Sequence, residues 1–174
     1  NEFLVLFDRV RILGGAATNT KHWKLWVPTK PVFVDGDTTN PQTGKWVSTN
    51  STTLKVTNQR GSTRAASTDY TSPPTHGRLF LKVLSPTNAT IAAYGDTLKE
   101  WQSGDGDGSM PWGNPDTTAN ATLIREYLGW GRIDVAPTDS SSYDAFLTVM
   151  QMGDANTLAS MTPVAKIASG DGKV

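Results

Sequence analysis

YDAFLTVMQM, at residues 143–152, has side chains that alternate between the two sides of an extended chain. Phe146, Thr148 and Met150 share one side, and the residues between them share the other. This period of two predicts a β strand rather than a helix. The apolar run RLFLKVL, at residues 78–84, predicts a second strand of the same kind.

Other strands are predicted on both sides of these two. Residues 45–49 and 53–57 are expected to form a hairpin around Thr49–Thr52. The only helical candidate is Thr118–Leu128. About ten strands, long polar loops and at most one short helix predict an all-β protein, an antiparallel β-sandwich. The remaining predicted strands are residues 3–12, 23–27, 32–34, 90–94, 132–136 and 165–168.

The composition excludes several classes of protein. The 174 residues include 16 Lys or Arg and 16 Asp or Glu, and this balance argues against a nucleic-acid partner. No apolar run reaches the ~20 residues of a membrane-spanning helix, so no membrane span is expected. The absence of Cys excludes disulfides and thiolate metal sites.

Residues 1–174 are expected to form a single β-sandwich domain that is a piece of a longer protein. An apolar strand starts at Glu2, and residues 169–174 resemble a turn followed by the start of another strand. Domains usually begin and end in exposed polar segments instead.

Nucleophilic catalysis has little support in the sequence. His22 and His76 are the only histidines, and neither lies in a recognisable nucleophile motif. No phosphate-binding glycine motif is present. Taken alone, the chain does not resemble a complete enzyme.

A glycine- and aspartate-rich loop lies between two tryptophans. GDGDGS, at residues 104–109, resembles part of a calcium loop through Asp105 and Asp107, and a turn without metal is the alternative. Trp101 and Trp112 flank this loop, and exposed aromatic faces of this kind stack on sugars. A place in the core is the alternative for both. The other tryptophans are expected to fill the core: Trp23, Trp26, Trp46 and Trp130.

Several segments match one family in chain order. FLVLFDRV, at residues 3–10, resembles an apolar strand that ends in Asp-Arg-Val, and GRLFLKVLSP, at residues 77–86, resembles a Gly-Arg-Leu-Phe strand. Both patterns are those of the heparinase II/III-like polysaccharide lyases. The other matching segments are WKLWVPTKP (23–31), YGDTLKEW (94–101), GRIDVAP (131–137) and YDAFLTVMQM (143–152).

The resemblance implies that the chain is one part of a secreted or extracellular enzyme. These lyases join a helical toroid to β-sandwich sheets and cleave uronic-acid polysaccharides by β-elimination. Most of their catalytic groups lie on the toroid, and this chain has no long amphipathic helices to build one. The chain is therefore expected to supply a wall that binds an acidic polysaccharide. The residues expected to contact it are Trp101, Glu100, Trp112 and Arg132.

The resemblance also bears on zinc. Some members of the family bind a structural zinc through one Asp and two His. Asp8 matches the Asp, but Trp26 stands where a His is expected. Because zinc takes about four ligands, the resemblance implies an incomplete site.

Two other functions stay open. The first is a secreted structural sandwich that assembles with copies of itself into filaments by strand exchange, with Phe3–Phe7 as the donated strand. The second is a stand-alone carbohydrate-binding module.

Overall fold

The strand predicted at residues 143–152 lies beside the first strand of the chain in the computed structural model. β10 (Tyr143–Asp154) pairs antiparallel with β1 (Glu2–Arg11), without a break in register. The structure describes residues 1–13, 20–59, 76–95, 130–139 and 141–167. The other strands are β2 (Trp23–Val27), β3 (Val32–Phe33), β4 (Thr39–Gln42), β5 (Lys45–Ser48), β6 (Thr53–Gln59), β7 (His76–Ser85), β8 (Ala89–Gly95) and β9 (Gly131–Pro137).

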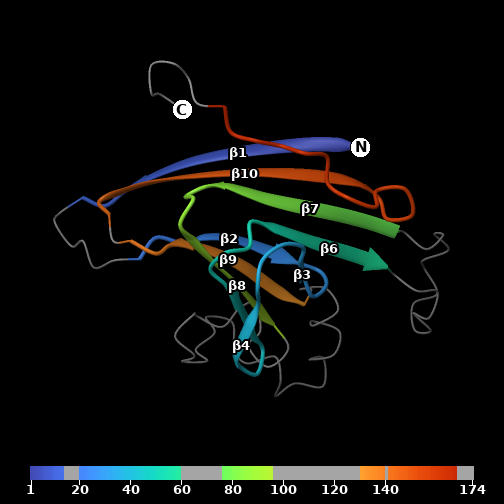
Figure 1. Ribbon diagram of the computed structural model, residues 1–174, viewed down its shortest axis with the longest axis horizontal. Helices are drawn as coiled ribbons and strands as arrows, with labels where there is room; N and C mark the ends of the chain where they lie inside the picture. The colour runs from blue at the N-terminus through green and yellow to red at the C-terminus, as the bar shows by residue number, and fades with distance from the viewer. Residues whose placement is uncertain (14–19, 60–75, 96–129, 140, 168–174) are drawn as a thin grey trace, which may run out of the picture.

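The ten strands of the described residues form two antiparallel sheets of five, stacked as two layers (Figure 1). The first sheet has the order β1-β10-β7-β6-β3, and the second sheet has the order β2-β9-β8-β5-β4. The prediction of an all-β sandwich is confirmed. In the part of the chain that the structure describes, no helix is long and apolar enough to cross a membrane.

The core lies between the sheets and is built from alternate residues of their strands. Leu54 on β6 lies opposite Leu81 on β7, and neither is exposed. The second sheet contributes Ile91, Ile133 and Val135, which are also fully buried. Because burial of one such side chain stabilises the fold by ~1.5–3 kcal/mol, these apolar rows hold the two layers together.

Residues 45–57 do not form the predicted hairpin. β5 pairs with β4 and β8 in the second sheet, whereas β6 pairs with β3 and β7 in the first. The chain therefore crosses from one layer to the other at residues 49–52. The polar residues that resemble a hairpin turn hold this crossing in place, since the Ser48 hydroxyl accepts the Ser51 N–H at 2.9 Å.

Two other expectations, and one strand that the sequence does not predict, concern shorter elements. β4 was not predicted because it is polar and contains Pro41, which hides any alternation. The strand predicted at residues 165–168 is wrong, since residues 165–167 have no strand structure. The helix predicted at Thr118–Leu128 lies outside the described residues.

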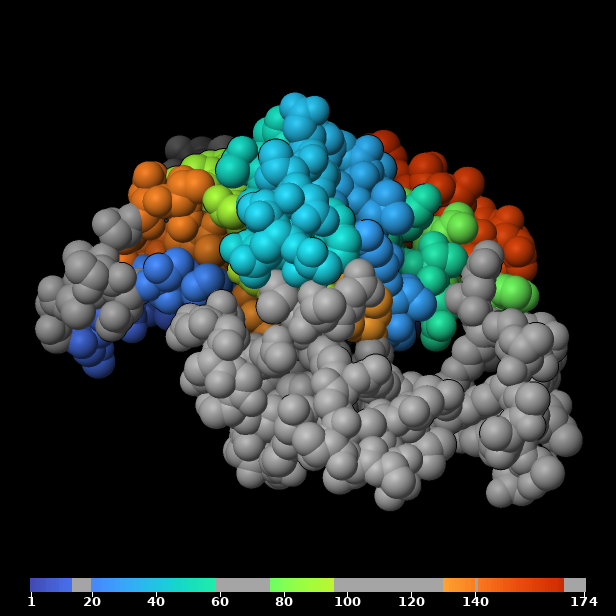
Figure 2. Space-filling view, turned by 90° about the horizontal axis from the view of Figure 1, so that it is seen from below, coloured from blue at the N-terminus to red at the C-terminus, as the bar shows by residue number. Residues whose placement is uncertain are grey.

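Figure 2 shows β4 and β5, in cyan, at the centre of one side of the molecule.

After β10 the chain turns back over the outer face of the first sheet. Gln151 on β10 is only 1% exposed, and its side chain is held by Thr162. The Thr162 N–H donates to Gln151 Oε1 at 2.7 Å, and Gln151 Nε2 donates to the Thr162 hydroxyl at 3.0 Å. Leu158 is buried in the same segment.

Candidate functional site

Alternate residues of β2 are exposed on the outer face of the second sheet. Trp23 and Leu25 pack against the core, and Val27 is buried. The residues between them point the opposite way, because side chains alternate along a strand. Lys24 and Trp26 are accordingly exposed, Trp26 at 56%. A large apolar ring and a cation therefore meet solvent side by side.

The same face continues across the sheet in a row of paired residues. Trp26 lies opposite Arg132 on β9. Arg132 lies opposite Tyr94 on β8, and Tyr94 lies opposite Lys45 on β5. Directly opposed residues share a face of the sheet. We call these four residues the outer row.

Two cations of the outer row lie close to its tyrosine ring. The guanidinium carbon of Arg132 is 4.6 Å from the centre of the Tyr94 ring, and Lys45 Nζ is 5.3 Å from it. Both distances are within the ~6 Å range of cation–π attraction. The outer row thus combines two aromatic rings with two positive charges.

A buried ion pair holds the arginine of the outer row in place. Arg132 Nε donates to Asp134 Oδ1 at 2.9 Å, and the two residues are 3% and 5% exposed. Asp134 Oδ2 also lies 3.9 Å from His22 Nδ1. Since buried charges are costly unless they are paired, Asp134 fixes the guanidinium and so its position beside Tyr94.

Arg132, one of the predicted glycan-binding residues, lies in the middle of the outer row. Arg132 is almost completely buried, and its guanidinium lies against Asp134 and the Tyr94 ring. Its direct contact with a glycan stays a prediction. The other predicted site residues lie outside the described residues: Trp101, Glu100, Trp112, Asp105 and Asp107.

The residues that the zinc pattern would need do not converge. Asp8 is exposed on β1 of the first sheet, opposite Phe146. Trp26, at the position where the resemblance implies a His, points outward from the second sheet. Within the described ranges, no group of three or more His, Cys, Asp or Glu side chains could hold a metal ion. The residues present therefore do not fit the zinc site.

The expectation that four tryptophans fill the core is wrong for one of them. Trp23 and Trp130 pack against the core, and Trp46 lies 5.5 Å from Trp130 between ring centres. Trp26 is on the surface. The alternation within WKLWV (residues 23–27) predicts this difference, because Trp23 and Trp26 are three positions apart and such residues face opposite sides of a strand. The sequence analysis does not predict three other residues of this face, because their placement depends on how the strands pair: Lys24, Lys45 and Tyr94.

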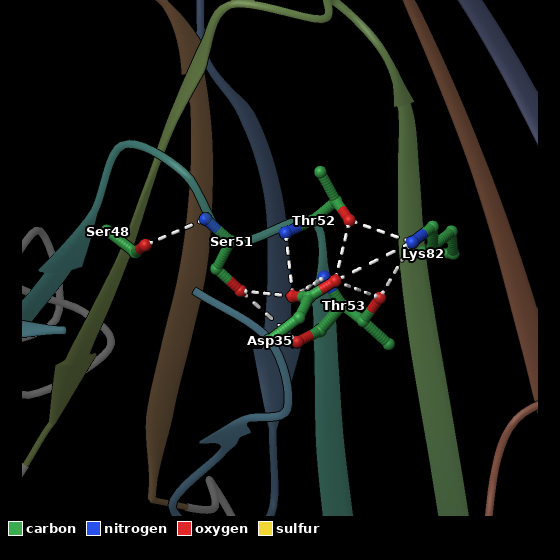
Figure 3. A network of polar contacts seen from close by, with 6 residues as sticks. All are labelled: Asp35, Ser48, Ser51, Thr52, Thr53 and Lys82. Carbon is green, nitrogen blue, oxygen red and sulfur yellow. Dashed lines mark hydrogen bonds and ion pairs between the residues drawn. The ribbon is translucent and has the colours of Figure 1, made fainter. Parts of the chain in front are cut away.

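A second charged cluster surrounds Asp35, near the crossing between the sheets (Figure 3). Asp35 Oδ1 accepts the N–H groups of Thr52 and Thr53 at 2.9 and 2.8 Å, and the Ser51 hydroxyl at 2.7 Å. Asp35 Oδ2 accepts the hydroxyls of Thr52 and Thr53 at 2.8 and 2.9 Å. Lys82 Nζ lies 3.6 Å from the same oxygen.

This cluster is suited to structure rather than to chemistry. Burial alone would raise the pKa of Asp35, but hydrogen bonds from Ser51, Thr52 and Thr53 outweigh it and hold the pKa well below its usual value. A carboxylate with so low a pKa and with both oxygens already bonded is a poor proton acceptor. Asp35 therefore clamps the chain where it changes sheets.

Comparisons with known proteins gave no match, either to a protein-family model or to a curated protein. The resemblance to the lyase family accordingly stays a prediction. The outer row and the exposed residues beside it are the features from which a function is inferred below.

Proposed function

We propose that this chain is the β-sandwich part of a secreted polysaccharide lyase that acts by β-elimination on uronic-acid-containing polysaccharide. The chain supplies a wall that binds the glycan, and the main catalytic residues lie elsewhere in the protein. The sequence resemblance suggests the reaction. The outer face of the second sheet supports the binding role.

The observation that carries the proposal is the exposed Trp26 beside the exposed Lys24. A sugar ring has apolar C–H faces that stack on an indole ring, and a uronic acid adds a carboxylate that an ammonium attracts. Tyr94 and Lys45 repeat the combination of ring and cation farther along the outer row. Such a face fits an acidic sugar chain better than a neutral one.

Isothermal titration of residues 1–174 with alginate or heparan-type oligosaccharides tests the binding role. Trp26→Ala and Lys24→Ala are expected to weaken binding by tenfold or more, and added salt should weaken it further. Tyr143→Ala and Arg11→Ala are the matched controls, because both residues are exposed on strands of the first sheet. Equal affinities of all four variants would refute the proposed site.

The lyase reaction needs a separate test, on a chain with its helical toroid restored. Cleavage should produce new absorbance at the band of unsaturated uronates. Failure with every uronate polymer would refute the lyase assignment. If the binding persisted in that case, it would favour the alternative of a stand-alone carbohydrate-binding module.

A further inference from the structure

Within the part of the chain that the structure describes, the two sheets end in four edge strands, and three of these are poorly suited to pair with another chain. β3 has two residues. β2 has five residues, carries Lys24 and is followed by Pro28. β4 contains Pro41, and its register with β5 is irregular between Thr39 and Gln42. Short length, charge, proline and irregular register all discourage edge-to-edge pairing.

β1 has a different character. It has ten residues, contains no proline and pairs with β10 without a register shift. Exposed apolar side chains lie on both of its faces, which is unusual for a strand at the margin of a sandwich. Its apolar residues with at least 37% exposure are Phe3, Leu4, Val5, Phe7 and Val10.

The backbone direction of β1 follows from one hydrogen bond just beyond its end. The Ile12 N–H donates to the Ser142 carbonyl at 2.8 Å. The backbone N–H and C=O groups of successive residues point alternately to the two sides of a strand. Because Ile12 bonds toward β10, the even-numbered residues of β1 also turn these groups toward β10. The groups of the odd-numbered residues from Phe3 to Arg11 face away from β10. Among the described residues, β10 is the only strand that pairs with β1.

We infer that the edge of β1 is a homodimer interface. β1 of one copy pairs antiparallel with β1 of a second copy, and the two first sheets, of five strands each, join into one continuous sheet. In this arrangement β1 keeps its full pairing with β10, unlike in strand exchange. The inference stands independently of the proposed glycan binding.

The charges and length of β1 select the register of this pairing. Centring the two-fold axis on Val5 would place Glu2 opposite Asp8, and centring it on Asp8 would place that carboxylate opposite its own copy. Like charges directly opposed are destabilising. Centring on Phe7 would place charged residues opposite apolar ones next to the axis, with Asp8 opposite Leu6 and Arg9 opposite Val5. Centring outside residues 5–8 would pair fewer residues of the strand.

The remaining central position is Leu6, which pairs every residue from Glu2 to Val10. Leu6 then lies opposite Leu6 of the second copy, and Val5 lies opposite Phe7. Phe3 lies opposite Arg9, a pair suited to cation–π attraction. The register thus joins apolar residues at the centre and puts cations beside aromatic rings at both ends.

Light scattering and crosslinking of residues 1–174 test the interface. The wild type is expected to have twice the mass of one chain. Val5→Glu places a carboxylate opposite the Phe7 ring, at a residue that is 60% exposed, and should raise the dimer dissociation constant tenfold or more. Val32→Glu is the matched control, because Val32 is 51% exposed on β3, at the other edge of the same sheet.

The chain has no Cys, so single-cysteine variants report the register directly. Leu6→Cys places two thiols across a non-hydrogen-bonded pair, where Cα atoms are ~4.5 Å apart, within the range of disulfides. Oxidation should give a covalent dimer for Leu6→Cys and much less for Val32→Cys. A monomeric wild type, a Val5→Glu variant that dimerises unchanged, or equal crosslinking at both sites would each overturn the inference.

Discussion

Replacing Asp144 with Asn is expected to destabilise the fold by about 3 kcal/mol, because it leaves the charge of Lys21 buried without its counterion. Lys21 Nζ lies 2.6 Å from Asp144 Oδ2, and the two side chains are 5% and 12% exposed. Removing one member of a buried pair costs ~3–5 kcal/mol. Lys21 keeps its hydrogen bond to the Ser141 carbonyl, which favours the lower end of this range. At ~2–4 °C per kcal/mol, the Tm should fall by about 6–12 °C.

Urea and thermal unfolding, followed by circular dichroism and tryptophan fluorescence, would measure this loss. The double variant Lys21→Met with Asp144→Leu should recover most of it, because both charges are then absent. Asp8→Asn is the control, since Asp8 is exposed on the neighbouring strand, and it should change stability by less than ~0.5 kcal/mol. A loss of less than ~1 kcal/mol for Asp144→Asn, as at a surface pair, would refute the reasoning.

Four further substitutions test other parts of the fold by the same unfolding assays. Asp35→Asn should cost about 1–2 kcal/mol near neutral pH, discounted because the side chain is 40% exposed. Since folding lowers the pKa of Asp35, its contribution to the free energy of unfolding is full above about pH 5 and declines as the pH falls below 3.8. The Asp35→Asn variant should lack this decline, and an acid unfolding profile equal to that of the wild type would contradict the clamp. Gly131→Ala should lower the free energy of unfolding by ~1–3 kcal/mol, because the added Cβ would overlap the Tyr94 carbonyl oxygen. An unchanged stability would contradict this and show that β8 and β9 can move apart. Trp23→Ala should cost ~3–5 kcal/mol and Trp26→Ala less than ~1, and equal losses would contradict their opposite placement.

The layers of the fold could be predicted from the sequence where side chains alternate over a long run. β1, β7 and β10 are such strands, and the class of sandwich follows from their number and polar connections. The connection between β5 and β6 could not be predicted, because a polar stretch of four residues serves equally as a hairpin turn or as a crossing between sheets. Here Asp35, distant in sequence, selects the crossing through tertiary hydrogen bonds.

The candidate site was predictable only in part. Arg132 was singled out by resemblance, but its neighbours depend on the register of four strands, which local sequence does not contain. Hydrophobicity alone predicts that Trp26 lies in the core, whereas the alternation along β2 places it on the surface. The pairing of Lys21 with Asp144 joins residues far apart in the chain, and no local pattern announces it.

The most direct test of the proposed function is to titrate an acidic oligosaccharide into isotopically labelled chain and follow the amide and indole N–H signals by NMR. The proposal predicts that the largest shifts fall on the Trp26 indole, on Lys24 and on Tyr94. The Trp23 indole, which faces the core, and the residues of β1 should shift little. The absence of any shift with every uronate tested, or shifts confined to the first sheet, would contradict the proposal.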